Sequence, residues 1–239
     1  MMHIKTAPSL ALATVLALAA SMTEAAEPAT AATPDFYSVL TTGKAHLEFR
    51  YRLESVDQDP FSRDATASTL RSRLNYQTGE LRGFSALVEA DNVTVIGDDD
   101  AYNSTVNGVT TRPVIADPGY TEVNQAYLQY KSGSFAGLLG RQRITLDNQR
   151  FIGNVGWRQN EQTFDGGSIV NKSLKDTTLT YSYIEYVNRV FGPDDGTQEI
   201  WLGDWESAIH LMNASYAGLP FGTLTAYGYL MDIESADAQ

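Results

Sequence analysis

The sequence predicts an all-β fold, a transmembrane antiparallel up-and-down β-barrel, and three observations predict it. Apolar and polar residues alternate along successive segments of the chain. Short turns and long loops alternate between these segments, as they do in membrane barrels. Acidic residues and lysines are sorted between the two kinds of connection.

The N-terminus has the pattern of a secretory signal peptide. Lys5 lies in its charged start, an apolar run extends from Ala7 to Met22, and small residues lead to a cleavage point after Ala25. This run is shorter than the roughly 20 apolar residues of a membrane helix. We therefore expect an exported protein with three parts: a signal peptide at 1–25, an N-terminal periplasmic segment at 26–43 and a partial barrel at 44–239.

The segment 44–54, KAHLEFRYRLE, alternates strictly. Leu47 and Phe49 fall on one face, and Arg50 and Arg52 fall on the other. A period of two is the pattern of a strand with one apolar and one polar face. Similar segments follow at 68–77, 83–94, 121–131, 135–143, 163–171, 176–187, 208–217 and 222–231. The sequence thus predicts nine strands.

The predicted connections alternate in length. Short turns are expected at 78–83, 132–134, 172–175 and 218–220, and long loops at 55–67, 95–120, 144–162 and 188–207. Three turns place a Tyr before and a Phe after the turn: Tyr76 and Phe84, Tyr130 and Phe135, and Tyr216 and Phe221. Such pairs are typical of the aromatic girdle at a membrane interface, with ordinary hairpin packing as the alternative.

Charge is sorted between the two ends of the predicted barrel. The loops at 55–67, 95–120 and 188–207, with the tail from Asp232, hold fifteen Asp and Glu against three Arg, which accounts for the net charge of −12. All four lysines beyond the signal peptide lie at the opposite end: Lys44, Lys131, Lys172 and Lys175. A soluble β-sandwich gives no reason for this sorting, so we expect the acidic loops outside and the turns in the periplasm.

The strand count is odd, whereas bacterial single-chain barrels have an even number of strands. The last residues, IESADAQ, resemble the beginning of another acidic loop. We therefore expect the sequence to be the N-terminal part of a longer barrel.

Composition argues against several other functions. There is no cysteine, and the acidic balance argues against nucleic-acid binding. After the signal peptide only His46 and His210 remain, without a motif-level Ser or Asp partner. The acidic run at Asp98 lacks the ligand spacing of a calcium loop. The sequence predicts no catalytic residue, metal site or cofactor.

Several stretches resemble the alginate export family of outer-membrane β-barrel porins. They are ASTLRSRLNY at 67–76, TEVNQAYLQY at 121–130, GRQRITLDNQRFIGNVGWRQNEQTFDGG at 140–167 and NRVFGPDDG at 188–196, and the third is the most specific. The resemblance extends from about Tyr37 to the end of the sequence. It implies a barrel of about 16 to 18 strands that passes anionic polysaccharide or smaller solutes without a chemical step.

The same resemblance implies the location and the partners. The protein is expected in the bacterial outer membrane after export, in contact with lipid and lipopolysaccharide. The barrel-assembly machinery is expected to insert it. Anionic or polar small solutes or oligosaccharides are the expected cargo, and nucleic acid is not.

Arginines occupy positions expected to face the barrel interior. The candidates for solute binding are Arg50, Arg52, Arg71, Arg73, Arg141 and Arg143, with Arg150 and Arg158 in the loop that follows. Guanidinium groups bind carboxylates bidentately, which suits the transit of uronates or other anions. The alternative is structural, because Glu48, Glu54, Glu89 and Asp91 are also expected to point inward and to pair with these arginines.

The inward orientation of two of these arginines depends on a condition. Arg141 and Arg143 have the same parity as Phe135, so both point inward only if a bulge intervenes or Phe135 belongs to the turn.

The loop at 144–162 is expected to line the pore, because a loop at this position often folds into the lumen of a porin. Asn148 and Gln149 supply neutral donors and acceptors, and Phe151 and Trp157 could anchor the loop or offer a flat face to a sugar ring. A cap on the solvent side is the alternative.

Two functions remain open at this stage. The first is an outer-membrane porin for anionic or polar solutes, a class that includes uronate oligosaccharides and alginate-like polysaccharide. The alternative is a soluble secreted β-sandwich that binds carbohydrate. They differ in what covers the apolar faces of the strands: lipid in a barrel, a second sheet in a sandwich.

Overall fold

The structure, a computed structural model, describes residues 35–192 and 203–233. Nine strands form one antiparallel sheet in which each strand pairs with its neighbours in sequence. They are β1 (Lys44–Val56), β2 (Ala65–Gln77), β3 (Phe84–Val95), β4 (Tyr120–Ser132), β5 (Phe135–Gln142), β6 (Thr163–Asn171), β7 (Thr177–Asn188), β8 (Asp204–Leu219) and β9 (Gly222–Ile233). All nine predicted strands are confirmed, each boundary within four residues.

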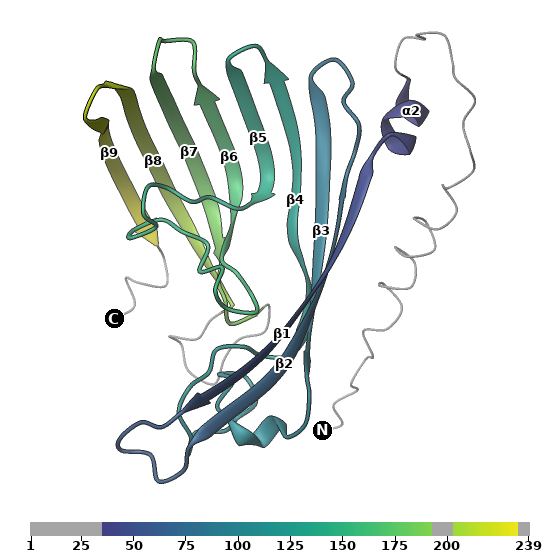
Figure 1. The fold of residues 1–239 in the computed structure, drawn as a ribbon, viewed down its shortest axis with the longest axis vertical. Helices are drawn as coiled ribbons and strands as arrows, with labels where there is room; N and C mark the ends of the chain where they lie inside the picture. The colour runs from purple at the N-terminus through teal and green to yellow at the C-terminus, as the bar shows by residue number, and fades with distance from the viewer. Residues whose placement is uncertain (1–34, 193–202, 234–239) are drawn as a thin grey trace.

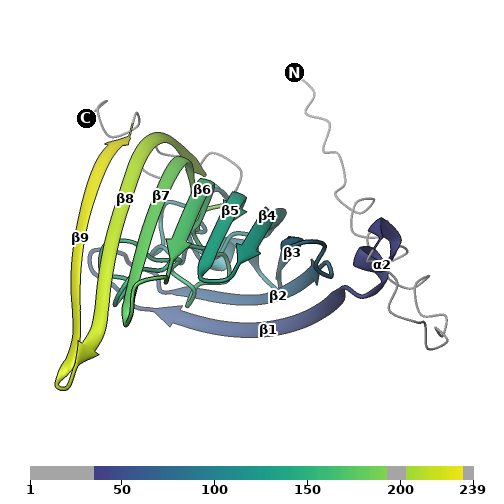
Figure 2. The same ribbon diagram turned by 90° about the horizontal axis from the view of Figure 1, so that it is seen from above.

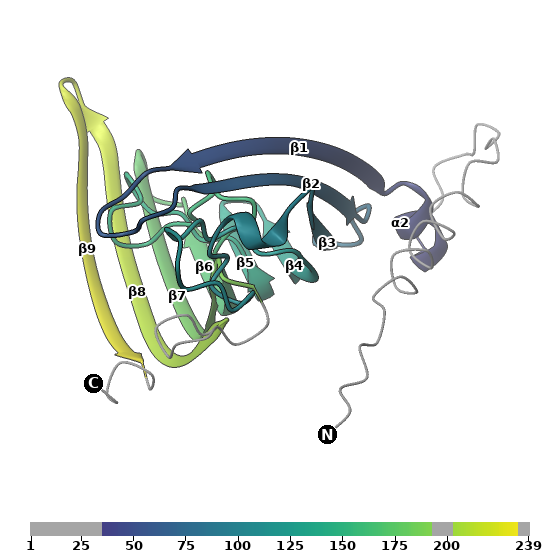
Figure 3. The ribbon, with the colours of Figure 1, turned by 90° about the horizontal axis from the view of Figure 1, so that it is seen from below.

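The sheet is a partial barrel. Figure 2 shows it curving from β9 around to β1, with part of the connection between β5 and β6 on its concave side, and Figure 3 shows the same curvature from the other end. The short turns gather at one end of the sheet and the long connections at the other (Figure 1). The predicted alternation of turns and loops is therefore confirmed.

The two faces of the sheet differ in exposure as the alternation predicts. On β1, Leu47 and Phe49 are exposed on the convex side, whereas Arg71 and Arg73 on β2 are buried on the concave side. Among the described residues there is one sheet and no second sheet covers the convex face. The β-sandwich alternative is therefore wrong.

Aromatic rings lie together at the turn end of the sheet. The ring centroids of Phe84 and Tyr130 are 4.6 Å apart, and those of Tyr130 and Phe135 are 6.5 Å apart. Phe221 is 85% exposed at the β8–β9 turn. These positions fit the predicted girdle, in which the rings face lipid rather than a protein core.

A short helix, α2 (Phe36–Thr41), precedes the sheet. Asp35 caps it by accepting a hydrogen bond from the Ser38 amide at 2.8 Å, and the Tyr76 hydroxyl donates to the Leu40 carbonyl. The sequence did not predict this helix, because six residues are too few for a helical period. The signal peptide lies outside the described residues, so it stays a prediction. Among residues 35–192 and 203–233, no helix is long and apolar enough to cross a membrane.

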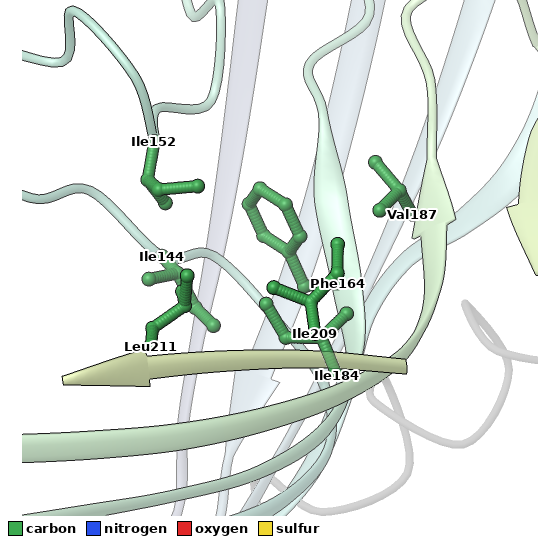
Figure 4. Close-up of a cluster of buried hydrophobic side chains, with 7 residues drawn as sticks. All are labelled: Ile144, Ile152, Phe164, Ile184, Val187, Ile209 and Leu211. Atoms are coloured by element: carbon green, nitrogen blue, oxygen red, sulfur yellow. The ribbon is translucent and has the colours of Figure 1, made fainter. Parts of the chain in front are cut away.

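Two small apolar clusters attach the long connections to the concave face. Ile144 and Ile152, between β5 and β6, pack on inward side chains of β6, β7 and β8 (Figure 4). Tyr102 and Ile115, between β3 and β4, pack on β2 through Ala65. The connection between β7 and β8 is described only at its two ends. The concave side is thus filled by chain from the loops rather than by a continuous apolar core.

Candidate functional site

The connection between β5 and β6, residues 143–162, is called the inner loop here because it lies against the concave face. Its Gln159 carbonyl accepts a hydrogen bond from Arg71 Nη1 at 3.2 Å. The Gln159 side chain reaches strand β2, where its Nε2 donates to the Thr69 hydroxyl at 2.9 Å. Gln159 is fully buried. The inner loop therefore crosses the concave side and is not a cap at the end of the sheet.

Two arginines of β1 hold the tip of the inner loop. Arg50 donates from Nε to Gln159 Oε1 at 3.0 Å and from Nη1 to the Gly156 carbonyl at 3.0 Å. Arg52 donates to the Trp157 carbonyl and pairs with Glu54 at 2.6 Å. Backbone carbonyls of the inner loop thus accept hydrogen bonds from two arginines that the sequence predicts to bind solutes.

A buried cluster centred on Glu161 holds the end of the inner loop. Glu161 pairs with Arg73 at 2.5 Å and with Arg143 Nε at 2.5 Å, and it accepts from Asn154 at 2.6 Å and from Asn124 at 2.9 Å. The Glu161 side chain is 2% exposed. Four groups from β2, β4 and the loop itself therefore converge on one carboxylate.

The same cluster extends to two carboxylates of β3. Arg73 binds Asp91 bidentately at 2.7 and 2.6 Å, and Arg143 reaches Glu89 at 2.8 Å. The two parallel hydrogen bonds fix the orientation of the Arg73 guanidinium and strengthen its ion pair with Asp91. Glu161 thus ties the inner loop to a pair that already braces β2 against β3.

The connection between β3 and β4 contributes a second contact to the inner loop. Asp117 accepts a hydrogen bond from the Gln159 amide at 2.9 Å. The same carboxylate lies 3.4 Å from Arg52 and 3.6 Å from Arg158. Asp117 is fully buried, so the two long connections support one another inside the partial barrel.

Arg141 lies on the opposite side of the sheet from the expected one. It shares its side of β5 with Leu139, which is 67% exposed on the convex face, and it pairs there with Asp165 at 2.8 and 2.9 Å. The pairing of β4 with β5 continues without a bulge through Arg141, so nothing reverses its parity. The expectation that Arg141 points inward is wrong.

Arg143, in contrast, does reach the concave side. Strand β5 ends at Gln142, and beyond it the strand alternation no longer applies. The chain turns inward there, which lets the Arg143 guanidinium reach Glu89 and Glu161.

The remaining candidates of the inner loop differ in how firmly they are held. Arg158 lies over the Trp157 ring at 4.1 Å and pairs with Glu54 at 3.1 Å. Asn148 accepts from the Arg150 amide at 3.1 Å, and Gln149 has a positive φ of 61°. Trp157 therefore anchors guanidinium groups and still keeps 58% of its surface exposed.

Glu161 and Asp117 are not among the residues that the sequence predicts for the site. The signal for Glu161 was present, because it is the one Glu within a stretch rich in Arg, Asn and Gln. Asp117 belongs to a loop whose acidic residues were assigned to solvent, and no local pattern sets it apart. Contacts between two loops distant in sequence have no periodic signature.

The Glu161 cluster predicts acid sensitivity. Burial alone would raise the Glu161 pKa, but the Arg143 hydrogen bond and the charges of Arg73 and Arg143 outweigh it and lower the pKa from 4.5 to about 2. A lowered folded-state pKa stabilises the protein above pH 4.5, and this stability, about 3 kcal/mol, is lost as the pH falls toward 2. The thermal unfolding temperature of the complete protein should therefore fall between pH 4.5 and pH 2.

The matched variant is Glu161→Gln, which cannot titrate. It should be less stable than the wild type at pH 7, and its unfolding temperature should fall less between pH 4.5 and 2. Equal pH slopes in the two proteins would contradict the assignment of the acid sensitivity to Glu161.

Comparison with known proteins identifies the family. The family model described as alginate export matches residues 44–183. A sequence search of curated proteins found no match.

Solved porin structures share the fold at low sequence identity. OccAB3 of Acinetobacter baumannii gives a TM-score of 0.62 at 18% identity, covering 81% of this chain and 50% of that one. OccD3 (OpdP) of Pseudomonas aeruginosa gives 0.55 at 14%, covering 82% and 42%. OpdK of Pseudomonas aeruginosa, solved with vanillate, gives 0.56 at 14%, covering 80% and 49%. The chain spans about half the length of these structures.

The matched residues include strands β1 to β6 and the inner loop, which is more than half of the chain. The fold is that of an outer-membrane porin barrel. The chain belongs to the alginate export family, and it is a β-barrel protein of the bacterial outer membrane.

Proposed function

We propose that the complete protein is a channel that passes anionic or polar solutes through an arginine-rich lumen without a chemical step. Uronate oligosaccharides and alginate-like polysaccharide are within this class. The observation that carries the proposal is the inner loop, which lies across the concave face through contacts with Arg50, Arg71 and Arg73. A polar segment in this position narrows a lumen and offers hydrogen-bonding groups to a passing solute.

The charges of the wall shape the expected selectivity. Six arginines take part in the network around the inner loop: Arg50, Arg52, Arg71, Arg73, Arg143 and Arg158. Six carboxylates balance them: Glu48, Glu54, Glu89, Asp91, Asp117 and Glu161. Opposite charges this close largely cancel one another beyond a Debye length of about 10 Å in roughly 0.1 M salt.

Because the charges of the arginines and carboxylates nearly cancel, we expect the channel to recognise its solute through direct contacts rather than through a strong electrostatic field. A conducting site must bind weakly, because a solute held too tightly does not leave. We therefore expect modest anion preference, with uronates distinguished from neutral sugars by individual arginine contacts.

The proposal includes an orientation and partners. The acidic connections lie outside the cell beside lipopolysaccharide, the short turns lie in the periplasm, and the barrel-assembly machinery inserts the chain. The exposed aromatic and aliphatic side chains of the convex face, such as Leu47 and Phe49, contact lipid.

Planar bilayers containing the complete protein test the channel. We expect stepwise ionic conductance, and we expect trigalacturonate to interrupt the current for longer than maltotriose, which has a similar size and no charge. Folded, membrane-inserted protein without conductance would overturn the channel. Conductance with equal interruptions by the two trisaccharides would overturn the uronate preference and leave the channel in place.

A further inference from the structure

A separate cavity lies between the inner loop and β9. Its volume is about 520 Å³, within the range of small-molecule sites. Six of the side chains that line it combine rings with polar groups: Asp147, Asn148, Arg150, Phe151, Tyr227 and Tyr229. None of these residues belongs to the network around Glu161, so the cavity is a second feature of the concave face.

Three aromatic rings form one side of this cavity. Tyr227 and Tyr229 are stacked, with ring centroids 5.1 Å apart and an interplanar angle of 22°. Phe151 lies 5.9 Å from Tyr227 and 6.3 Å from Tyr229. Tyr229 pairs in register with Leu211, whose side chain is buried on the concave face, so the two tyrosines point into the barrel rather than toward lipid.

In the described part of the chain, the rings are accessible as well as close together. Phe151 is 60% exposed and Tyr227 is 53% exposed. Aromatic rings on the inside of a water-filled barrel offer apolar faces that water solvates poorly, and a ligand ring can cover them.

Arg150 is the arginine among the described residues that line this cavity. Its guanidinium lies 5.5 Å from the Phe151 ring centroid. Among the described residues it has no carboxylate or carbonyl partner, whereas the other seven arginines predicted to bind solute each have at least one. Arg150 is therefore the candidate arginine whose donors are open to a ligand.

Asp147 also lines the cavity, and its carboxylate is held by a neighbouring strand. Asp147 accepts a hydrogen bond from Asn213 of β8 at 3.1 Å, and no ion pair joins it to Arg150 in the described part of the chain. Asp147 and Asn148 line the cavity with oxygen atoms that accept hydrogen bonds from hydroxyl groups. Within the described part of the chain, the cavity thus combines aromatic faces, the guanidinium of Arg150 without an ion pair, and acceptors for hydroxyl groups.

We propose that this cavity is a binding site for a ring that carries a carboxylate. The rings of Phe151, Tyr227 and Tyr229 cover the ligand ring, and Arg150 binds its carboxylate through two N–H donors. Two sources share this chemistry, a hexuronate and an aromatic carboxylate. The site depends on the proposed channel only because the ligand reaches it through the lumen.

Equilibrium dialysis of the complete, detergent-solubilised protein against labelled galacturonate or benzoate tests the site without any conductance. Glucose lacks the carboxylate and acetate lacks the ring, so they are the control ligands. We expect Arg150→Gln to weaken binding of the ring carboxylates about tenfold and to leave glucose binding unchanged. Tyr227→Leu, which keeps an apolar side chain, should weaken binding about threefold.

The matched control is Arg63→Gln, which removes an arginine from the exposed β1–β2 connection and should bind as the wild type does. Heat-modifiable mobility in gels verifies that each variant is folded. Stronger binding of galacturonate assigns the site to sugar acids, and stronger binding of benzoate assigns it to aromatic acids.

Two results would overturn the site: wild-type binding of ring carboxylates no tighter than of glucose and acetate, or unchanged binding in folded Arg150→Gln and Tyr227→Leu proteins. Because dialysis needs no current, a site that binds in a protein that does not conduct would refute the channel alone. A channel that conducts without the predicted binding would refute the site alone.

Discussion

Replacing Arg73 with Leu should release the inner loop and lower the stability of the protein by about 3–5 kcal/mol. The Arg73 side chain is 10% exposed and pairs with Asp91 and Glu161, whose side chains are 0% and 2% exposed. Its removal leaves buried Asp91 without its bidentate partner and, among the described residues, leaves Glu161 with Arg143 alone as its counter-charge, which costs more than the loss of a surface ion pair. Urea unfolding and single-channel conductance of the complete protein measure the two effects.

The conductance should rise several-fold, because a loop that leaves the concave face no longer narrows the lumen. Arg73→Lys retains the charge but not the bidentate contact with Asp91, so it should fall between the wild type and Arg73→Leu. Arg63→Leu, on an exposed connection, is the control and should change neither quantity. Wild-type conductance and stability in Arg73→Leu would refute the anchoring role of Arg73.

Replacing Ile152 with Asp should release the first half of the inner loop. Ile152 is 4% exposed and packs in the apolar cluster with Phe164, Ile184 and Leu211 (Figure 4). The described neighbours of Ile152 in this cluster are apolar, so the loop must move to solvate a carboxylate there, at a cost of about 3 kcal/mol. Conductance should rise and urea stability should fall.

Ile96→Asp is the matched control, because Ile96 is 46% exposed on the connection between β3 and β4. The double variant Arg73→Leu with Ile152→Asp tests whether both contacts hold one segment. If either change alone frees the loop, the combined loss of stability should be smaller than the sum of the two single losses. Strict additivity would mean that the two halves of the inner loop are held independently.

Much of the fold follows from the alternation of apolar and polar residues along each strand. The alternation of Leu47 and Phe49 with Arg50 and Arg52 assigns the two faces of β1, because successive side chains of a strand point to opposite sides. The same rule fails at Arg141 and Arg143. Both have the same parity, yet Arg141 faces outward within β5 and Arg143 faces inward beyond its end.

The sequence by itself determined the nine strands, their order and which residues of each strand are apolar, since these depend on neighbours along the chain. Only the tertiary structure decided the partners of the arginines. Arg50 and Gln159 are 109 positions apart, and Arg143 and Glu89 are 54 apart. The aromatic cavity arose in the same way, because Phe151 and Tyr227 meet only once the sheet curves. Coulomb attraction and ring contacts depend on the distance between two groups in space and not on their separation along the chain. The path of the folded chain therefore decides which groups pair, and these pairs have no periodic pattern in the sequence.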